Sequence, residues 1–349
     1  MKVFITDCEG PITKNDNALE LCAHFIPEGE RFFTVLSRYD DYLAYVERRP
    51  GYKAGDTLKL VLPFLLAFGA TEEEMLPFSL KHLLTMPRAL EALRRIGGTM
   101  PTFVVSTSYE PYIKALCGLV PLSMTNAYCT TLKLGKLQLS EGERRRLQEL
   151  AREIASMPLV EWEELPEGVR LRPGLEEVVR RLDEIFWREL SEGMAGEVLR
   201  RVDPVGGEAK AKAVREILRK VGAKPEEALY VGDSITDREA LRFIREGGGV
   251  AVAFNANRYA LEVAEVACLS RDASPLVVLA LLFLRGGKEE VVKGVLNWEE
   301  EYLRARGVPE EWFAPAEVGI VTQDNLPLWV SKSEAFRKEV RGVKVGALG

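Results

Sequence analysis

The chain has 349 residues, 47% of them hydrophobic and 29% charged, a balance typical of a globular protein and not of a disordered or fibrous one. Its net charge of −6 disfavours nucleic acid and anionic membrane surfaces as partners. The longest apolar run, Pro275–Leu284, is too short to span a bilayer. Five cysteines without a CxxC pair, and an apolar strand directly after Met1, predict a reduced, cytoplasmic protein with no signal peptide.

The first predicted element is a buried parallel strand over Lys2–Thr6, an apolar run rich in β-branched residues. It stops at two carboxylates, Asp7 and Glu9, and Gly10 with Pro11 then turns the chain. In open α/β sheets, ligands bind at the carboxyl ends of the strands. Both carboxylates are therefore predicted to lie in a ligand site.

The next stretch, from Asn17 to about Ile96, has the periodicity of helices separated by Pro and Gly residues. Asn17 with Glu20 has the spacing of a capping box, which predicts the start of the first helix. Both histidines of the chain, His24 and His82, fall here without a Ser or Cys partner at a known spacing. A hydrolytic triad is therefore disfavoured.

A second core strand, Thr102–Val105, is predicted to end at Ser106, and a helix follows over residues 109–117. The Ser106 hydroxyl and the main-chain amides of Thr107 and Ser108 are donors that could hold a phosphate at this strand end. A structural helix cap is the alternative role for Ser106.

Residues from about 126 to 205 are predicted to form a mainly helical insertion. Glu141–Ser156 and Gly174–Arg201 have the pattern of charged helices, and no residue pattern in this region indicates chemistry. The insertion could shape substrate access or form a subunit interface.

Two lysines stand near the start of the next helix, which carries a buried stripe that includes Val214. Around the helix axis, Lys210 lies roughly 40° from Val214, whereas Lys212 points roughly 200° away. Lys210 is therefore predicted to face the core and the ligand site, and Lys212 to face water.

A later strand, Ala228–Gly232, also ends in two carboxylates, Asp233 and Asp237. Side by side, the two strand ends would bring these together with Asp7 and Glu9. So many acids repel one another unless a cation lies among them. Oxygen ligands suit a hard ion, and Mg²⁺ is the first choice.

Two further buried strands, Val250–Phe254 and Val266–Leu269, complete the predicted core. Strands alternating with helices indicate an α/β fold with a doubly wound, mainly parallel sheet. The last stretch, residues 286–349, carries three tryptophans among charges and is predicted to be an ordered appendage that packs on the core.

The three strand ends and the lysine occur in the same order as the four sequence motifs of the haloacid dehalogenase (HAD) superfamily. The chain therefore resembles this superfamily. The matching residues are Asp7-x-Glu9-Gly10, the strand that ends at Ser106, Lys210 or Lys212, and Gly232-Asp233-x-x-x-Asp237. Residues 7–17 also resemble a small archaeal branch labelled energy-converting hydrogenase A subunit R.

The resemblance implies a domain organisation. Residues 1–12 and 98–285 would form a Rossmann-like HAD core that carries the insertion at about 126–205. Residues 13–97 would form a helical cap that closes over the active site, because both of its ends return to strand ends at that site. The alternative is a helical domain that only adds stability.

The resemblance also implies a magnesium-dependent phosphatase that acts on a small phosphorylated metabolite. Asp7 would attack phosphorus and form an aspartyl-phosphate, while Ser106 and Lys210 would bind the phosphoryl oxygens. Glu9 would be the general acid and base, a position where the superfamily usually has Asp. The superfamily's enolase-phosphatases also read Asp-x-Glu-Gly, so the longer side chain is compatible with phosphatase chemistry.

For the metal, the resemblance implies four residues. Mg²⁺ would be bound by the Asp7 carboxylate, the main-chain carbonyl of Glu9 and Asp233. Asp237 would hold a metal-bound water or pair with Lys210.

Asp16 lies nine residues after Asp7, the offset at which phosphoserine phosphatases carry a Glu that contacts the substrate. It could therefore bind a cationic or polar part of the substrate, or it could be a helix N-cap.

Two other functions are weighed against the phosphatase. One is another phosphoryl transfer, and the other is a HAD-fold accessory or scaffold subunit without turnover.

Overall fold

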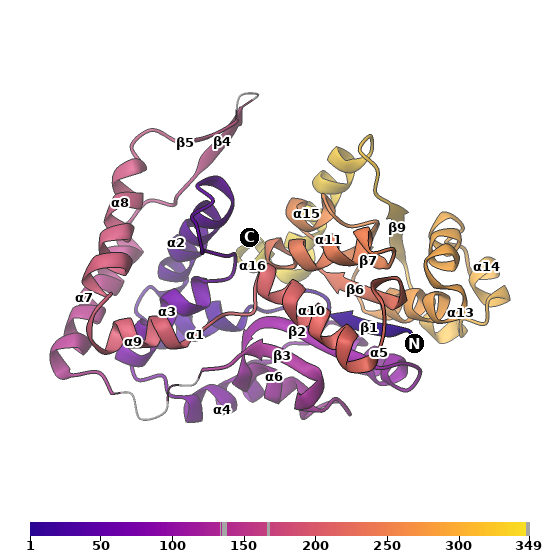
Figure 1. The fold of residues 1–349 in the computed structure, drawn as a ribbon, viewed down its shortest axis with the longest axis horizontal. Helices are drawn as coiled ribbons and strands as arrows, with labels where there is room; N and C mark the ends of the chain where they lie inside the picture. Colours follow the sequence, from indigo (N-terminus) through magenta and orange to yellow (C-terminus); the bar gives the residue numbers. More distant parts are fainter. Residues whose placement is uncertain (133, 135–137, 166–167, 347–349) are drawn as a thin grey trace.

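The computed structural model describes residues 1–132, 134, 138–165 and 168–346, and a seven-stranded sheet forms its centre (Figure 1). All neighbouring strands are parallel except the last two, which are antiparallel. In spatial order the strands are β3 (Ala127–Thr130), β2 (Thr102–Tyr109), β1 (Val3–Thr6), β6 (Ala228–Gly232), β7 (Val250–Phe254), β8 (Val266–Ser270) and β9 (Ala316–Ile320).

Helices cover both faces of this sheet because side chains alternate along each buried strand. In β1, Phe4 packs on one face, and Val3 and Ile5 pack on the other. The Phe4 face carries α5 (Ala89–Gly97), α6 (Glu110–Cys117), α13 (Ser274–Leu296) and α14 (Glu300–Ala305). The opposite face carries α10 (Glu208–Val221), α11 (Arg238–Glu246), α12 (Arg258–Leu261) and α15 (Leu326–Arg341). The predicted doubly wound, mainly parallel sheet is confirmed.

The strand order reverses at β1, which lies between β2 and β6. The amide of Asp7 donates to the carbonyl of Val231 at 2.8 Å, so the first strand's end is fixed against β6. The loops after β1, β2 and β6 therefore leave the sheet side by side, at the switch point where α/β sheets bind ligands.

The helices that follow β1 and those that follow β3 share one hydrophobic core beside the sheet (Figure 1). The first group is α1 (Asn17–Phe25), α2 (Gly29–Asp41), a π-helical turn (Tyr42–Val46), α3 (Thr57–Ala67) and α4 (Glu72–His82). The second group is α7 (Glu141–Ser156), the β4–β5 hairpin (Trp162–Leu165 and Gly168–Leu171), α8 (Glu176–Glu184), a π-helical turn (Ile185–Glu189) and α9 (Gly193–Arg201). The two segments thus form one helical body.

Two strands of the central sheet were not predicted, and neither was the β4–β5 hairpin. Strand β3 falls inside the expected insertion at about 126–205 but pairs with β2 in the core sheet, so the helices of that segment begin only after Thr130. Strand β9 belongs to the expected C-terminal appendage but forms the edge of the same sheet. Helices α15 and α16 (Val343–Gly346) then bring the chain's end back between α2 and the sheet (Figure 1).

All five cysteines are unpaired. Among the described residues, no helix is long and apolar enough to cross a membrane.

Candidate active site

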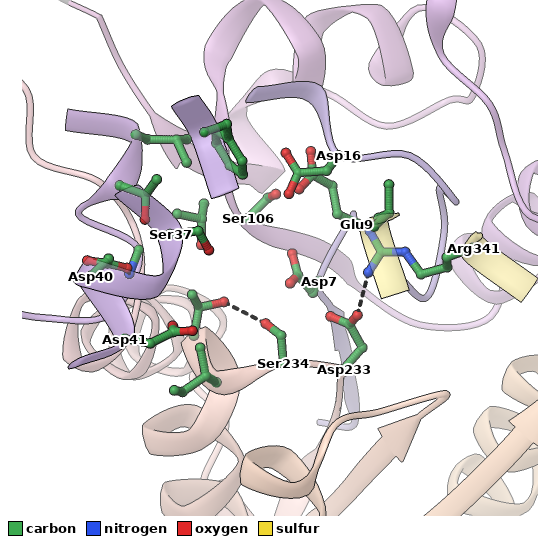
Figure 2. Close-up of a pocket in the computed structure, with 18 of the residues that line it drawn as sticks. Asp7, Glu9, Asp16, Ser37, Asp40, Asp41, Ser106, Asp233, Ser234 and Arg341 are labelled. Atoms are coloured by element: carbon green, nitrogen blue, oxygen red, sulfur yellow. Dashed lines mark hydrogen bonds and ion pairs between the residues drawn. The ribbon is translucent and has the colours of Figure 1, made fainter. Parts of the chain in front are cut away.

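A cavity of about 80 Å³ lies at the switch point, between the sheet and the helical body (Figure 2). Its walls come from distant parts of the chain, including the loops after β1, β2 and β6, helix α2 and the two last helices. The polar residues that line it are Asp7, Glu9, Asp16, Ser37, Asp40, Asp41, Thr57, Ser106, Thr107, Asp233, Ser234, Thr236, Arg337 and Arg341.

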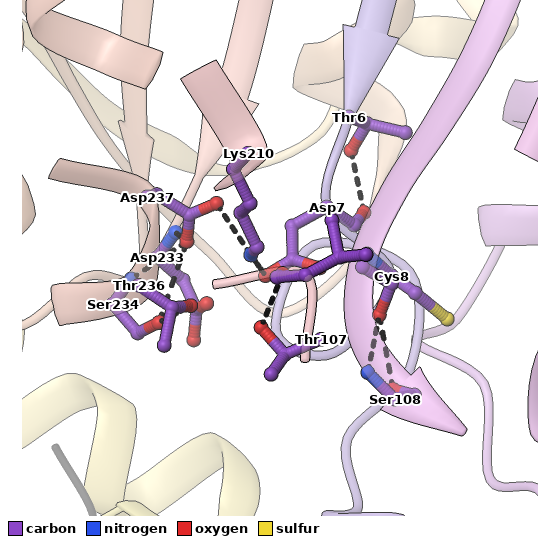
Figure 3. A network of polar contacts seen from close by, with 12 residues as sticks. Thr6, Asp7, Cys8, Thr107, Ser108, Lys210, Asp233, Ser234, Thr236 and Asp237 are labelled. Carbon is purple, nitrogen blue, oxygen red and sulfur yellow. Dashed lines mark hydrogen bonds and ion pairs between the residues drawn. The ribbon is translucent and has the colours of Figure 1, made fainter. Parts of the chain in front are cut away.

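Lys210 joins two of the predicted carboxylates at the floor of this site (Figure 3). Its fully buried ammonium lies 2.5 Å from Oδ2 of Asp7 and 2.7 Å from Oδ1 of Asp237. Lys212 is exposed, as the helical phase predicts. Asp237 also accepts from the hydroxyl of Tyr230 at 2.7 Å. Of the two roles predicted for Asp237, pairing with Lys210 is therefore present in the structure.

Burial makes the charge of Asp7 costly. Desolvation raises the pKa of Asp7 to about 8, Lys210 opposes that rise, and the carboxylates of Asp237 and Asp233 add to it. Burial alone would lower the pKa of Lys210, but the two carboxylates raise it, so this lysine stays charged. Lys210 is shared between Asp7 and Asp237, and a further cation beside Asp7 would favour its ionised form.

The carboxylates of Asp7, Asp233 and Asp237 could hold such a cation. One oxygen from each lies within 4.8 Å of the others, and all three residues are buried. An all-oxygen set at the end of two strands fits a hard divalent ion such as Mg²⁺. The carboxylate of Glu9 does not belong to this cluster; its predicted contribution is the main-chain carbonyl.

Two glycines let the acidic loops approach each other. Gly10 has φ +100°, and a Cβ there would lie 2.3 Å from Cγ of Asp233. At Gly232, a Cβ would lie 2.5 Å from Cγ of Asp237. Gly232 is thus required by space, and Gly10 is required by both space and backbone conformation.

Asp233 has two cationic partners that the sequence motifs do not reveal. Arg337 and Arg341 of α15 both form ion pairs with Oδ2 of Asp233, and the side chains are 3% and 4% exposed. Arg341 lies 2.8 Å from this oxygen and also donates to the carbonyls of Lys14 and Asn15, at 2.8 and 3.2 Å. Arginines four residues apart in a charged helix are common, so no sequence signal identifies them.

Glu9 and Asp16 line the pocket beside Asp7 (Figure 2). Glu9 accepts from the amide of Asn17 at 2.9 Å. Asp16 accepts from the amide of Leu19 at 2.9 Å and is the N-cap of α1, so the predicted capping box starting at Asn17 is wrong by one residue. Desolvation, reinforced for Glu9 by the charge of Asp16, raises the pKa of both carboxyl groups.

The three predicted donors after β2 differ in position. Ser106 and Thr107 line the pocket, whereas Ser108 does not. The Ser106 and Ser108 hydroxyls lie 2.9 Å apart, and the Thr107 hydroxyl donates to the carbonyl of Val205 at 3.0 Å. Of the three side chains, Ser106 is therefore the one that faces the pocket without a fixed carbonyl partner.

The chain belongs to the haloacid dehalogenase-like hydrolase family, whose model matches residues 1–244. The solved structure of a gene product from Archaeoglobus fulgidus is similar over 100% of this chain and 99% of that chain, with 31% identity and a TM-score of 0.83. No curated protein matches the chain.

Two further solved structures are more distant. A phosphoserine phosphatase in apo form has 14% identity and a TM-score of 0.40, over 79% of this chain and 97% of that one. A HAD family hydrolase from Salmonella enterica serovar Typhi has 11% identity and a TM-score of 0.43, over 74% and 64% of the two chains.

We predict that Arg341→Met destabilises the protein by about 3–5 kcal/mol, because the change leaves the buried Asp233 with one cation fewer and two carbonyls without their donor. Lys338→Met removes a charge from an exposed position of the same helix and is the matched control. Urea denaturation followed by tryptophan fluorescence measures both. Equal midpoints for the two variants would contradict the role of Arg341.

Proposed function

We propose that this protein is a magnesium-dependent phosphatase that hydrolyses a small phosphorylated metabolite through an aspartyl-phosphate at Asp7. The observation that carries the proposal is the buried Asp7 carboxylate, held by Lys210 and facing a pocket beside Asp233 at the switch point. A phosphate could enter such an acidic place only with cations beside it. Family membership supports hydrolysis as the type of reaction.

In the first step, an Asp7 carboxylate oxygen forms a bond to phosphorus, and the bond from phosphorus to the ester oxygen breaks. Glu9 gives its proton to the leaving oxygen. Desolvation and the charge of Asp16 raise the pKa of Glu9, which favours the protonated form that a general acid needs. Lys210 holds Asp7 in position, and the Ser106 hydroxyl donates to a phosphoryl oxygen.

In the second step, a water molecule attacks phosphorus and releases the Asp7 carboxylate. Glu9, now ionised, takes the proton of that water. Mg²⁺ bound by Asp7, Asp233 and the Glu9 carbonyl would supply positive charge for the phosphoryl oxygens. The pairing of Asp237 with Lys210 holds the lysine against Asp7. Thr107 and Ser108 would contribute main-chain amides.

Two alternatives share this site: transfer of the phosphoryl group to an acceptor other than water, and a subunit role without turnover. The complete set of Asp7, Glu9, Ser106, Lys210 and Asp233 favours an enzyme, because a scaffold does not need it. Residues 7–17 resemble the archaeal branch labelled energy-converting hydrogenase A subunit R. Our proposal includes membership of this branch.

Hydrolysis should require the metal. A metabolite panel and nitrophenyl phosphate, assayed with Mg²⁺ and with EDTA, should show turnover with Mg²⁺ only. Calorimetry should show weaker Mg²⁺ binding to Asp233→Asn, which loses a charged ligand, and unchanged binding to Asp324→Asn at an exposed position. Equal turnover in EDTA would contradict the proposal.

The two lysines provide a second test. Lys210→Met should lower kcat/KM by about 10²-fold or more, because Asp7 loses its cation and donor. Lys212→Met removes an exposed charge and should retain activity. Both variants are compared for nitrophenyl phosphate, with melting temperatures to exclude unfolding. A larger loss at Lys212 would reverse the assignment.

Glu9→Gln keeps the shape of the side chain and removes its proton transfer. It should slow hydrolysis of alkyl phosphates by about 10²–10⁴-fold and of nitrophenyl phosphate much less, because nitrophenolate leaves without a proton. Mg²⁺ affinity should survive, since the main-chain carbonyl is unchanged. Equal loss with both esters together with loss of Mg²⁺ binding would make the side chain a ligand instead.

A further inference from the structure

Helix α2 forms the wall of the pocket that faces Asp7 and Asp233, and it carries Ser37, Asp40 and Asp41 (Figure 2). None of these residues belongs to the motifs recognised in the sequence. Asp40 is explained by the fold, because it accepts from the hydroxyl of Tyr52 at 2.7 Å and from the amide of Gly55 at 2.9 Å. It thereby holds the loop before α3 against α2.

Asp41 has no comparable partner. The other carboxylates that line the pocket each accept at least one hydrogen bond from the chain, namely Asp7, Glu9, Asp16, Asp40 and Asp233. In the described part of the pocket, Oδ2 of Asp41 is the exception, since it is buried and accepts none. The residue is 3% exposed, so water does not replace the missing donor freely.

The nearest cation does not satisfy Asp41. Nη1 of Arg38 lies 3.7 Å from Oδ2, beyond hydrogen-bond length, and its guanidinium lies over the ring of Trp162 at 4.6 Å. Desolvation accordingly raises the pKa of Asp41 to about 7, although Arg38 opposes the rise. A buried carboxylate that lacks a donor and faces a cavity is typical of a functional site.

Three buried cations lie at the other end of the cavity. Lys210 pairs with Asp7, and Arg337 and Arg341 pair with Asp233. A phosphate group and a divalent ion would occupy that end. The part of a substrate that extends away from phosphorus would meet the α2 wall, where the charge is negative and one carboxylate lacks a donor.

We propose that the pocket selects phosphate monoesters that carry a cationic group, such as an ammonium, and that Asp41 binds that group. This inference rests on the proposed phosphatase function, which fixes the phosphate at Asp7. An ammonium donor would complete the hydrogen bonding of Asp41 and offset its buried charge. A neutral ester of the same size would leave that carboxylate without a hydrogen-bond donor, which disfavours its binding.

The test compares pairs of phosphate esters in Mg²⁺, each pair matching an amino ester with a neutral ester of the same size. The shortest pair is 2-aminoethyl phosphate and propyl phosphate, and the longest is 4-aminobutyl phosphate and pentyl phosphate. Wild-type protein should prefer the amino member of at least one pair by roughly 10- to 100-fold in kcat/KM. Where an ester is not turned over, its inhibition constant against nitrophenyl phosphate takes the place of kcat/KM.

Asp41→Asn keeps the shape of the side chain and should remove most of that preference. It should melt at or above the wild-type temperature, because it removes a buried charge whose only ion pair, with the half-buried Arg38, is long. Asp56→Asn is the matched control. Asp56 is 2% exposed, has a buried oxygen without a hydrogen bond and lies 3.7 Å from Lys59, but it does not line the pocket. This control should keep the wild-type preference.

Equal values within every pair for the wild-type protein, or a preference that survives in Asp41→Asn, would overturn the inference while leaving the phosphatase in place. Absence of turnover for every ester, nitrophenyl phosphate included, would contradict the proposed function itself, and the inference with it.

Discussion

The structure depends on three buried carboxylates held close together. Asp7, Asp233 and Asp237 meet because β1 and β6 are neighbours in a parallel sheet and both end at the same edge. Burial raises the pKa of Asp7, and the charges of Asp237 and Asp233 add to that rise. The chain places Lys210 from α10 against two of them, and arginines from α15 against the third.

The arginines explain why the last helix belongs to the site. Arg341 connects the loop after β1, the loop after β6 and α15 through one guanidinium, which presents its donors in a fixed plane. A buried ion pair adds little net stability, but the loss of one partner is costly. Asp233 and α15 therefore constrain each other, and strand β9, which precedes α15 in the chain, joins the same sheet.

Local spacing made part of this site predictable. The acids follow the strands by fixed numbers of residues, and the helical phase alone distinguishes Lys210 from Lys212. Contacts between distant segments were not predictable. Arg337 and Asp233 are 104 residues apart in the sequence. Whether Asp41 has a hydrogen-bond donor depends on how side chains from several elements pack around it.

The differences between the predicted and the observed fold also have physical causes. Strands β3 and β9 lie at the two edges of the sheet and are only partly buried, so neither has the continuous apolar run by which the central strands were predicted. The start of α1 was misplaced because Asp16 and Asn17 are both good N-cap residues, and only the bond to Leu19 distinguishes them. Asp16 thus has a structural role and also lines the pocket, so its predicted substrate contact stays open.

The walls of the cavity are held with unequal strength. At the Asp233 end, buried arginines fix α15 to the core. Where α16 meets α2, the ion pair between Lys344 and Glu30 is exposed, and Val345 packs on the helical body only partly buried. Exposed ion pairs contribute little, because water screens them and both side chains lose freedom. Separating α2 from α16 would therefore cost less than breaking the arginine contacts, so this is the wall of the cavity that we expect to move more easily.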